Sequence, residues 1–394
     1  MCAEKSAVIV GAGIAGLTTA YALARDGWQV EIFEQAHKLE PVGAGIQLGP
    51  NATRLLDRNG LLDAVRAYSV ETESLLVRAG LDGRTLSGMQ HGAFASARWG
   101  APFHVIHRGD LQSVLLDALD DLNGVTLHLG QRLESVMQRD GRVYATFLKY
   151  SEERIAEAPL LIGADGVWSR VRGHIGLPGP TTFSGCVAWR TVVPASAVSD
   201  HARLNRSNLW LGPDAHVVHY PIRCGELVNI VAVIEDSWRE KGWSESGDVG
   251  WINRRFRDWH PDLAGLIGSA HNWLRWSLFD RAPEWKWVRD NAVLMGDAAH
   301  PMLPFLAQGA AQAIEDAFVL AACLRDAPTQ KDALDRYQTL RISRAARVQK
   351  SSHRQMRIYH AAGPLAYARN FALGALGETG MAARYDWLYS GPTV

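Results

Sequence analysis

The sequence predicts an α/β (α+β) fold, in which a parallel sheet flanked by helices binds a nucleotide and a mainly antiparallel sheet is inserted into that unit. Three short apolar runs, at residues 7–10, 160–162 and 292–295, support the first part because each leads into a glycine-containing turn. Between residues 181 and 285 the nucleotide motifs are absent, and extended runs are separated by Pro, Gly and Asp. The nucleotide-binding unit is therefore expected to be discontinuous in the sequence.

The first glycine-containing turn has the spacing of a dinucleotide-binding motif. Residues 11–16 read GAGIAG, between a predicted buried strand and a helix expected over 17–25. Glycines allow the chain to bend tightly and let its backbone approach a pyrophosphate at the positive helix N-terminus. A second strand, 29–33, ends at Glu34, where a carboxylate accepts hydrogen bonds from a ribose hydroxyl of FAD or NAD. The turn residues expected to surround the pyrophosphate are Gly11, Gly13, Ala15 and Gly16.

Two later turns favour FAD over NAD. Residues 163–166 read GADG after the second apolar run, and a Gly-Asp pair follows the third, ahead of a helix predicted to begin at Gly309. A dehydrogenase needs no third strand–Gly-Asp–helix unit, whereas a flavoprotein does. Asp297 can meet the ribityl or ribose hydroxyls, and the helix N-terminus can face the electron-rich edge of the flavin ring. We expect a non-covalent FAD, held in part by Asp165, Gly296, Asp297, Gly309 and Ala310.

These motifs belong to a longer resemblance. The chain resembles the single-component flavin-dependent aromatic hydroxylases, in particular the branch with salicylate hydroxylase, 3-hydroxybenzoate 6-hydroxylase and 6-hydroxynicotinate 3-monooxygenase. The resemblance spans nearly the whole chain, and it is specific for the fold and the cofactor but much less so for the substrate. The matching stretches are 11–16, Glu34, 43–51, 107–111, 163–172, 296–316 and 384–389.

The resemblance implies a p-hydroxybenzoate hydroxylase-like fold and a monooxygenase reaction. Such an enzyme consumes NADH or NADPH as a transient co-substrate. It inserts one atom of O2 into a small hydroxylated aromatic acid, salicylate- or hydroxybenzoate-like, through a C4a-hydroperoxyflavin. Arg108 is then expected at the pyrophosphate, because Arg suits forked phosphate contacts, unless it is an ordinary surface residue. Residues 45–47 and 301–308 are expected to flank the flavin ring and keep it dry.

The candidate catalytic base is His216, which matches the catalytic histidine of these relatives, and Tyr220 matches a pocket tyrosine. In a strand these two residues share one face, whereas His219 points to the other. The ordinary pKa of histidine, about 6.5, suits removal of a phenol proton near neutral pH. Two alternatives stay open: His216 only satisfies a backbone carbonyl, or a shifted register turns His219 into the pocket. Neither His-x-x-His pair predicts a metal site, because this spacing diverges on a strand.

Differences from the relatives leave the substrate open. Pro304 stands where the 3-hydroxybenzoate enzyme has a substrate-contacting glutamine, and Gln47 replaces a histidine of the hydroxynicotinate enzyme. Alternative substrates are a hydroxypyridine carboxylic acid and another phenolic or quinone-pathway ring. Alternative classes are a non-hydroxylating flavin oxidoreductase and a flavin-binding sensor. The expected pocket residues are Gln47, His216, Tyr220, Pro301 and Pro304, and Gln47 is also expected to contact the flavin.

Composition restricts the partners. Lys plus Arg and Asp plus Glu both number 41, so the formal net charge is zero and no basic surface is expected for nucleic acid. No apolar run reaches the ~20 residues of a membrane span. The four cysteines are widely spaced and form no Cys-x-x-Cys pair, which favours free thiols in a reducing cytoplasm. We expect a small aromatic substrate as partner, and a monomer or homodimer.

The expected domain limits follow the motifs. Residues 1–180 and 286–345 form the discontinuous FAD-binding domain. Residues 181–285, with a strand near 71–79, form a substrate-binding β-sheet domain over the flavin. Residues 346–394 form a C-terminal helical segment, because helical spacing of Ala, Leu and Arg is already established from residue 332 onward.

Overall fold

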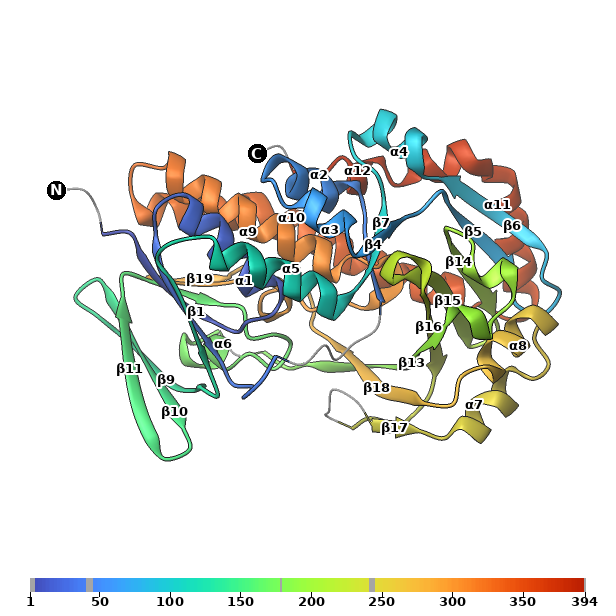
Figure 1. Ribbon diagram of the computed structural model, residues 1–394, viewed down its shortest axis with the longest axis horizontal. Helices are drawn as coiled ribbons and strands as arrows, with labels where there is room; N and C mark the ends of the chain where they lie inside the picture. The colour runs from blue at the N-terminus through green and yellow to red at the C-terminus, as the bar shows by residue number, and fades with distance from the viewer. Residues whose placement is uncertain (1–3, 40–44, 178, 241–244, 393–394) are drawn as a thin grey trace.

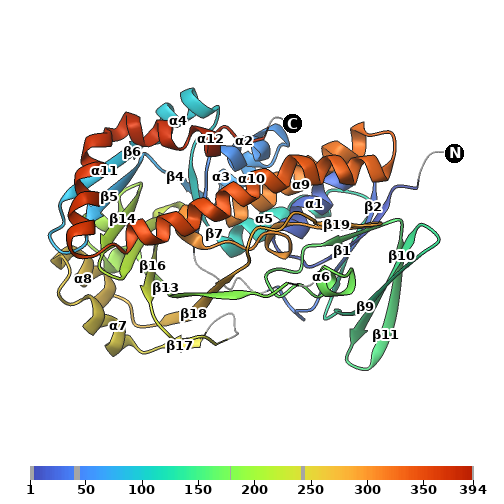
Figure 2. The same ribbon diagram turned by 180° about the vertical axis from the view of Figure 1, so that it is seen from behind.

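The computed structural model describes residues 4–39, 45–177, 179–240 and 245–392, so Cys2, Gly43 and Ala44 lie outside the described residues. The molecule is elongated, with one sheet toward each end and long helices between them (Figure 1). Helix α9 (Gly309–Asp326) lies at the six-stranded sheet at one end, and α10 (Gln330–Tyr359) runs from there toward the eight-stranded sheet at the other end (Figure 2). The predicted mixed fold of helices and sheets is confirmed.

A six-stranded sheet carries the three glycine-containing turns. Its order is β19-β20-β12-β1-β2-β8, and all neighbours are parallel except β19 and β20. The ends of three neighbouring strands are in register, because Val10 pairs with Gly163 and Gly163 with Leu294. The turns that follow them therefore meet at one edge, where parallel sheets bind ligands. The strands are β1 (Ser6–Val10), β2 (Gln29–Glu34), β8 (Val125–Leu129), β12 (Leu160–Gly163), β19 (Val288–Arg289) and β20 (Ala292–Leu294).

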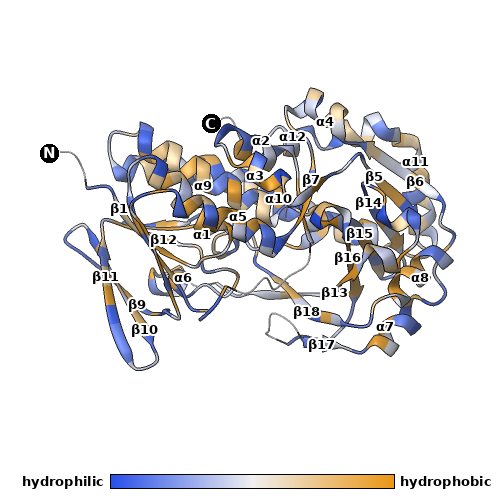
Figure 3. Ribbon diagram, in the orientation of Figure 1, coloured by the Kyte–Doolittle hydropathy of each residue, from blue (hydrophilic) through white to orange (hydrophobic). Residues whose placement is uncertain are grey.

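Helices pack against this sheet and against one another. Helix α1 (Ile14–Arg25), which follows the first turn, contacts both α5 (Arg108–Asp120) and α9. The strands β1 and β12 are apolar over most of their length (Figure 3), because helices and neighbouring strands bury them. Beside them lies a three-stranded antiparallel sheet that the motifs did not predict. Its strands are β9 (Arg132–Arg139), β10 (Arg142–Lys149) and β11 (Glu152–Ala158).

An eight-stranded sheet forms the other half, in the order β17-β18-β13-β16-β15-β14-β5-β6. Its pairs are antiparallel except β14 with β5, and β5 is the strand expected near residues 71–79. The strands are β5 (Ser74–Ala79), β6 (Thr85–Gln90), β13 (Thr182–Pro194), β14 (Arg206–Gly212), β15 (Ala215–Ile222), β16 (Leu227–Glu235), β17 (Glu245–Gly247) and β18 (Trp273–Asp280).

The two faces of this sheet pack against different partners. Odd-numbered residues of β13, such as Val187 and Trp189, join an apolar cluster with α7 (Val249–Phe256) and α8 (Pro261–Gly268). Even-numbered residues of β13 instead join a cluster with the 301–308 loop. We call this second face the inner face. Strand alternation therefore sorts side chains between an outer helix layer and the loop expected beside the flavin.

A small sheet and short helices complete the core of the molecule. The small sheet has the order β3-β7-β4, and β3 carries the 45–47 segment expected beside the flavin ring. The remaining elements are β3 (Gly45–Leu48), β4 (Ser69–Glu71), β7 (His104–His107), α2 (Pro50–Arg58), α3 (Leu62–Arg66), α4 (Gly92–Trp99) and α6 (Arg170–His174).

The chain after residue 326 is helical, as expected. Helix α10 is followed by α11 (Gly363–Arg384), which packs along β6, and by α12 (Asp386–Tyr389). The predicted domain limit at 345–346 falls inside α10, which continues without a break to residue 359. The chain therefore has no structural break at this limit, because the same helix runs from the six-stranded sheet toward the eight-stranded sheet. No helix of the described residues is long and apolar enough to cross a membrane.

Candidate active site

The first turn brings backbone atoms so close together that only glycine fits at two positions. Gly11 has a φ of +104°, and a Cβ there would lie 2.5 Å from the carbonyl oxygen of Ala164 in the second turn. A Cβ on Gly16 would lie 1.9 Å from the carbonyl oxygen of Gly11. In contrast, a Cβ on Gly13 would meet no atom within 4 Å. Gly11 and Gly16 close the turn onto the sheet, whereas Gly13 leaves the backbone open to a ligand.

Glu34 lies beside this turn at the end of β2. Its carboxylate oxygens accept hydrogen bonds from the backbone N–H groups of Ala12, at 2.9 Å, and Ala36, at 2.8 Å. The carboxylate is thereby fixed, but the side chain is only half-buried and a carboxylate has about four acceptor positions. Glu34 therefore shapes the loop and retains acceptor capacity for a sugar hydroxyl. The contact with a ribose stays a prediction.

Arg108, the first residue of α5, lies close enough to Glu34 and Asp297 to interact electrostatically with both carboxylates. Burial lowers the pKa of Arg108, and the charges of Asp297 and Glu34 oppose this shift. Burial likewise raises the pKa of Asp297, and the charges of His300 and Arg108 oppose it. Asp297 is nevertheless exposed, so its side chain is not part of the packed interior. A cation near two acids beside the glycine turns suits a pyrophosphate with sugars on either side.

Asp165, by contrast, uses its carboxylate within its own turn. It accepts hydrogen bonds from the Ser169 hydroxyl at 2.6 Å and from the backbone N–H groups of Arg170 and Val171 at 2.7 and 3.0 Å. These contacts fix the start of α6 and hold the second turn in contact with Gly11. Asp165 therefore shapes the groove through the backbone, and a direct contact with the cofactor stays a prediction.

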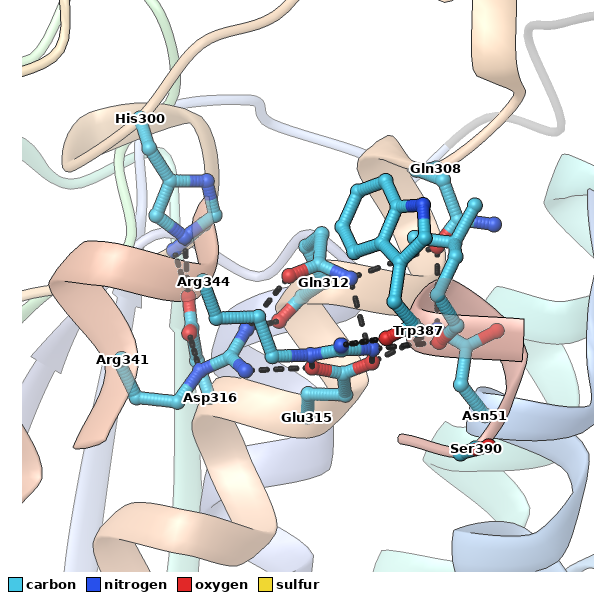
Figure 4. A network of polar contacts seen from close by, with 12 residues as sticks. Asn51, His300, Gln308, Gln312, Glu315, Asp316, Arg341, Arg344, Trp387 and Ser390 are labelled. Carbon is cyan, nitrogen blue, oxygen red and sulfur yellow. Dashed lines mark hydrogen bonds and ion pairs between the residues drawn. The ribbon is translucent and has the colours of Figure 1, made fainter. Parts of the chain in front are cut away.

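The third turn is held by a buried ionic network (Figure 4). Asp316 accepts a hydrogen bond from the backbone N–H of Gly296 at 2.8 Å and contacts Nε2 of His300 at 2.6 Å. Its other oxygen accepts a hydrogen bond from Nε of Arg341 at 2.7 Å. Burial alone raises the pKa of Asp316, but the charges of His300 and Arg341 bring it to about 2. Helix α10 thereby positions the turn that carries Gly296 and Asp297.

A second acid, Glu315, extends the network to the residues just before α9. It pairs with Arg341 and Arg344, and its Oε1 accepts a hydrogen bond from the amide of Asn51 at 2.7 Å. The same Asn51 amide donates to Gln308, the residue before α9, at 3.0 Å. Two arginines from α10 therefore balance two acids from α9, and the helix start is tied to α2.

The start of α9 itself is open. A Cβ on Gly309 would meet no atom within 4 Å, and Ala310 is only half-buried. The positive end of a helix dipole thus faces free space. With Gly13 open at the other turn, the described residues fit an FAD whose pyrophosphate lies near α1 and whose flavin ring lies near α9.

The inner face of the eight-stranded sheet presents His216 toward the 301–308 loop. The ring centroid of His216 lies 5.0 Å from that of Phe305 in this loop. Its Nδ1 lies 2.9 Å from Nε2 of His360, so the partner of His216 is another histidine rather than a backbone carbonyl. His219 points to the other face, where its ring lies 6.4 Å from that of Trp210. The strand register therefore turns His216 inward and His219 outward.

Tyr220 lies against the second expected flavin loop. A Cβ on Gly45 in β3 would lie 2.6 Å from a ring carbon of Tyr220. The backbone N–H of Gly45 donates to the side-chain oxygen of Asn229 at 2.7 Å, while the buried Nδ2 of Asn229 has no hydrogen-bond partner among the described residues. Burial raises the pKa of Tyr220 well above its usual value, so this phenol stays neutral. The site thus holds a neutral hydroxyl and an amide donor that remains free for a ligand.

The other predicted pocket residues lie on the same two loops. Gln47 is in β3 and is half-buried. Pro304 begins the single turn η5 (Pro304–Leu306), and the carbonyl of Pro301 accepts a hydrogen bond from Gln349 of α10 at 2.9 Å. Their contacts with substrate or flavin stay predictions.

Sequence reasoning missed Arg190, an unpaired cation on the inner face. Its guanidinium lies over the ring of Trp276, 3.3 Å from the centroid, and it forms no hydrogen bond or ion pair with the residues described. Burial lowers the pKa of Arg190 to about 9, and the nearby Arg108 charge acts in the same direction. Arg190 also lies close enough to Tyr220 to interact with it. The only available signal was a single charged residue within the otherwise apolar run 186–193.

The open glycine turns, the open start of α9 and the inner face of the eight-stranded sheet together define a flavin-binding protein. Residues 4–352 match the family model described as FAD binding domain, and the chain belongs to this family. It is 34% identical to 3-hydroxybenzoate 6-hydroxylase 1 of Aquipseudomonas alcaligenes over 392 residues, which cover 99% of each chain. It is also 34% identical to 6-hydroxynicotinate 3-monooxygenase of Pseudomonas fluorescens, over 88% of this chain and 89% of the relative.

A solved structure has the same fold. The structure of Klebsiella pneumoniae HpxO complexed with FAD and uric acid superposes with a TM-score of 0.88 at 24% identity, and covers 100% of this chain and 98% of that chain. The resemblance to single-component flavin-dependent aromatic hydroxylases is confirmed, as is FAD as cofactor. The chain is an FAD-dependent enzyme of this aromatic hydroxylase group.

Proposed function

We propose that the enzyme hydroxylates a small ring that carries one phenolic hydroxyl and one carboxylate, as in salicylate or a hydroxybenzoate. The observation that carries this proposal is the inner face itself, which combines a neutral histidine, a neutral tyrosine and an unpaired arginine. Burial, together with the neighbouring His360, lowers the pKa of His216 well below 6.5, so this imidazole is free to accept a proton at neutral pH. When bound, FAD supplies the redox chemistry, which is the uptake of electrons from NAD(P)H and the activation of O2.

The chain's own residues have separate tasks in this reaction. Arg190 holds the carboxylate, because a guanidinium that has no acid partner among the described residues gains most from a charged ligand. His216 accepts the phenolic proton, which raises the electron density of the ring that is to be oxidised. Tyr220 donates a hydrogen bond to the substrate oxygen, since its pKa keeps it protonated. The apolar residues around Phe305 exclude water from the same space.

The proposed cofactor contacts follow the groove. The pyrophosphate lies against the backbone of Gly11, Gly13 and Ala15, with Arg108 beside it. Glu34 accepts hydrogen bonds from the adenosine ribose, and Asp297 from the flavin side of the dinucleotide. We further propose that the protein acts in the cytoplasm as a monomer or homodimer, without nucleic acid. Free Cys186, Cys224 and Cys323 support the first point.

A substrate panel tests the proposed function. Purified enzyme with FAD is given salicylate, 3-hydroxybenzoate, 4-hydroxybenzoate or 6-hydroxynicotinate with NADH or NADPH, and products are identified by mass spectrometry. We expect at least one acid both to accelerate NAD(P)H oxidation and to gain one oxygen atom. If only the hydroxypyridine acid is hydroxylated, the proposed substrate ring is wrong but the enzyme is still an aromatic-ring monooxygenase. Oxidation of NAD(P)H with no oxygenated product from any of the acids would contradict the proposal.

Replacing Arg190 by Met should weaken binding of the acid. Loss of hydrogen bonds to a charged group costs about 1.5–3 kcal/mol, which corresponds to a rise in KM of roughly 10- to 100-fold. The phenol that lacks the carboxylate should bind the variant and the wild type equally. Arg275→Met is a matched control, because Arg275 also lies over a tryptophan, Trp238, at 4.2 Å. An unchanged KM for the acid in Arg190→Met would remove the assigned role.

A further inference from the structure

A short chain of hydrogen bonds leads from the buried site to the protein surface. Nδ1 of His216 lies 2.9 Å from Nε2 of His360, and Nδ1 of His360 lies 3.0 Å from Oε1 of Glu235. The side chains of His360 and Glu235 are 2% and 49% exposed, and His216 as a whole is 3% exposed. Two hydrogen bonds thus connect a buried imidazole to a carboxylate in contact with water.

The three residues joined by these hydrogen bonds lie in or next to three different elements. His216 is in β15, His360 directly follows α10, and Glu235 ends β16. The turn that carries His360 is fixed by Arg369 of α11, which donates to the carbonyl of Tyr359 at 2.9 Å. The backbone carbonyl of His360 also accepts a hydrogen bond from Asp214 N at 3.2 Å. The backbone that carries His360 is therefore held in place from two sides.

The other ring nitrogen of His216 is free for a ligand. Nε2 of His216 has no hydrogen-bond partner among the described residues, and the ring lies between Phe305, at 5.0 Å, and Tyr359, at 5.2 Å. An imidazole that is bonded at one nitrogen and free at the other can accept a proton on one side and release one on the other.

A base in this position needs an exit for the proton. Burial lowers the pKa of His216 well below its usual value, and burial lowers the pKa of His360 to about 4. An imidazolium left on either ring is therefore costly. Simultaneous transfer along the chain avoids this cost, because each ring then gains one proton as it loses another.

We propose that His360 and Glu235 form a proton path through which His216 passes the substrate's phenolic proton to solvent; the proposal rests on the proposed hydroxylase function. The phenolic O–H bond breaks and an N–H bond forms at Nε2 of His216. The proton on Nδ1 of His216 moves to Nε2 of His360, and the proton on Nδ1 of His360 moves to Glu235 and then to water. When the product leaves as a neutral phenol, the path runs in reverse and restores both rings. His360 and Glu235 act through His216 and are positioning residues.

The surroundings keep the two imidazoles of this path neutral in the resting state. Burial has the largest effect on the pKa of His360 and lowers it, the charges of Arg255 and Arg369 act in the same direction, and the charge of Asp214 opposes them. Burial and the charge of Asp214 raise the pKa of Glu235 above its usual value, so this carboxylate takes up a proton more readily. Burial raises the pKa of the neighbouring Cys186 to about 12 and that of Tyr359 well above its usual range. Neither of these last two groups titrates near neutral pH.

The test measures deprotonation of bound substrate separately from oxygen transfer. Oxidised holoenzyme is mixed rapidly with 3-hydroxybenzoate, salicylate or 6-hydroxynicotinate below the phenol's own pKa, and formation of the bound phenolate is followed by absorbance. We expect His360→Ala and Glu235→Gln to slow this step about 10- to 100-fold, toward the low end of what loss of a general base costs. FAD content and substrate Kd should stay as in the wild type, and imidazole should restore part of the rate in His360→Ala.

Matched controls separate a proton path from a structural role. Glu226→Gln changes an exposed acid at the other end of β16 and should leave the rate unchanged. ¹⁵N NMR of the wild-type holoenzyme without substrate should show His216 and His360 both neutral at pH 7 and hydrogen-bonded to each other. Wild-type deprotonation rates in both His360→Ala and Glu235→Gln, or charged rings in the NMR spectrum, would overturn the proton path. Absence of any hydroxylated product in the substrate panel would instead overturn the proposed function, and the NMR result would still decide the hydrogen-bonded chain.

Discussion

Replacing His216 by Ala should lower the rate of hydroxylation by about 10²–10³, within the range for loss of a general base. The physical reason is that the phenol must then lose its proton to solvent in a site from which apolar side chains exclude water. FAD content should not change, because His216 belongs to the eight-stranded sheet and not to the dinucleotide groove. NAD(P)H oxidation can persist, with oxygen released as hydrogen peroxide. Product and peroxide are measured per NAD(P)H consumed.

The pH dependence distinguishes this role from a packing effect. In the wild type the lowered pKa of His216 keeps the imidazole neutral, so its contribution as a base is present at neutral pH. This contribution is lost only when the pH falls well below 6.5, the usual pKa of histidine. In His216→Ala the rate should rise as pH approaches the phenol's own pKa, because the phenolate then forms without a base. His219→Ala, on the outer face, is the matched control. A His216→Ala enzyme with normal rate and coupling would remove the assigned role.

Replacing Arg341 by Met should reduce the free energy of unfolding by about 3–5 kcal/mol, the usual cost of removing one partner of a buried ion pair. Arg341 is fully buried, and its loss leaves Asp316 without the hydrogen bond at 2.7 Å and Glu315 without one of its two arginines. Because Asp316 also holds Gly296 N, the variant should retain FAD less well. Denaturant unfolding and the flavin-to-protein absorbance ratio measure the two effects.

The control for Arg341 is on the same helix. Arg336 is exposed, and Arg336→Met removes one positive charge without touching the network. It should change stability by no more than about 0.5 kcal/mol. Equal stability of Arg341→Met and Arg336→Met would contradict the structural role of the network in Figure 4.

The features that followed from the sequence are those set by local pattern. Apolar runs, glycine spacing and strand alternation predicted the three turns and the common face of His216 and Tyr220, and the resemblance to the family assigned that face to the pocket. Glycine is required at positions 11 and 16 because a Cβ there would lie less than 3 Å from a backbone oxygen. Such a requirement fixes the residue type and can therefore be recognised in a sequence.

The features that did not follow depend on partners far apart in the chain. The contact of His216 with His360 joins residues separated by 144 positions, and no local pattern marks it. Arg190 is visible in the sequence as one charged residue in a mostly apolar strand, but the lack of an acid partner among the described residues is a property of the folded site. The limit expected at 345–346 failed because the spacing of α10 continues through it, so composition alone gave no true boundary.

The proposed reaction of this site is the transfer of one oxygen atom from O2 to a phenolic acid. The most direct test supplies ¹⁸O2 and NAD(P)H with the acid that the panel identifies, and measures the mass of the product. One ¹⁸O atom is expected in each hydroxylated product molecule, with one NAD(P)H consumed for each. Unlabelled product, or ¹⁸O recovered only as hydrogen peroxide with every acid tested, would contradict it.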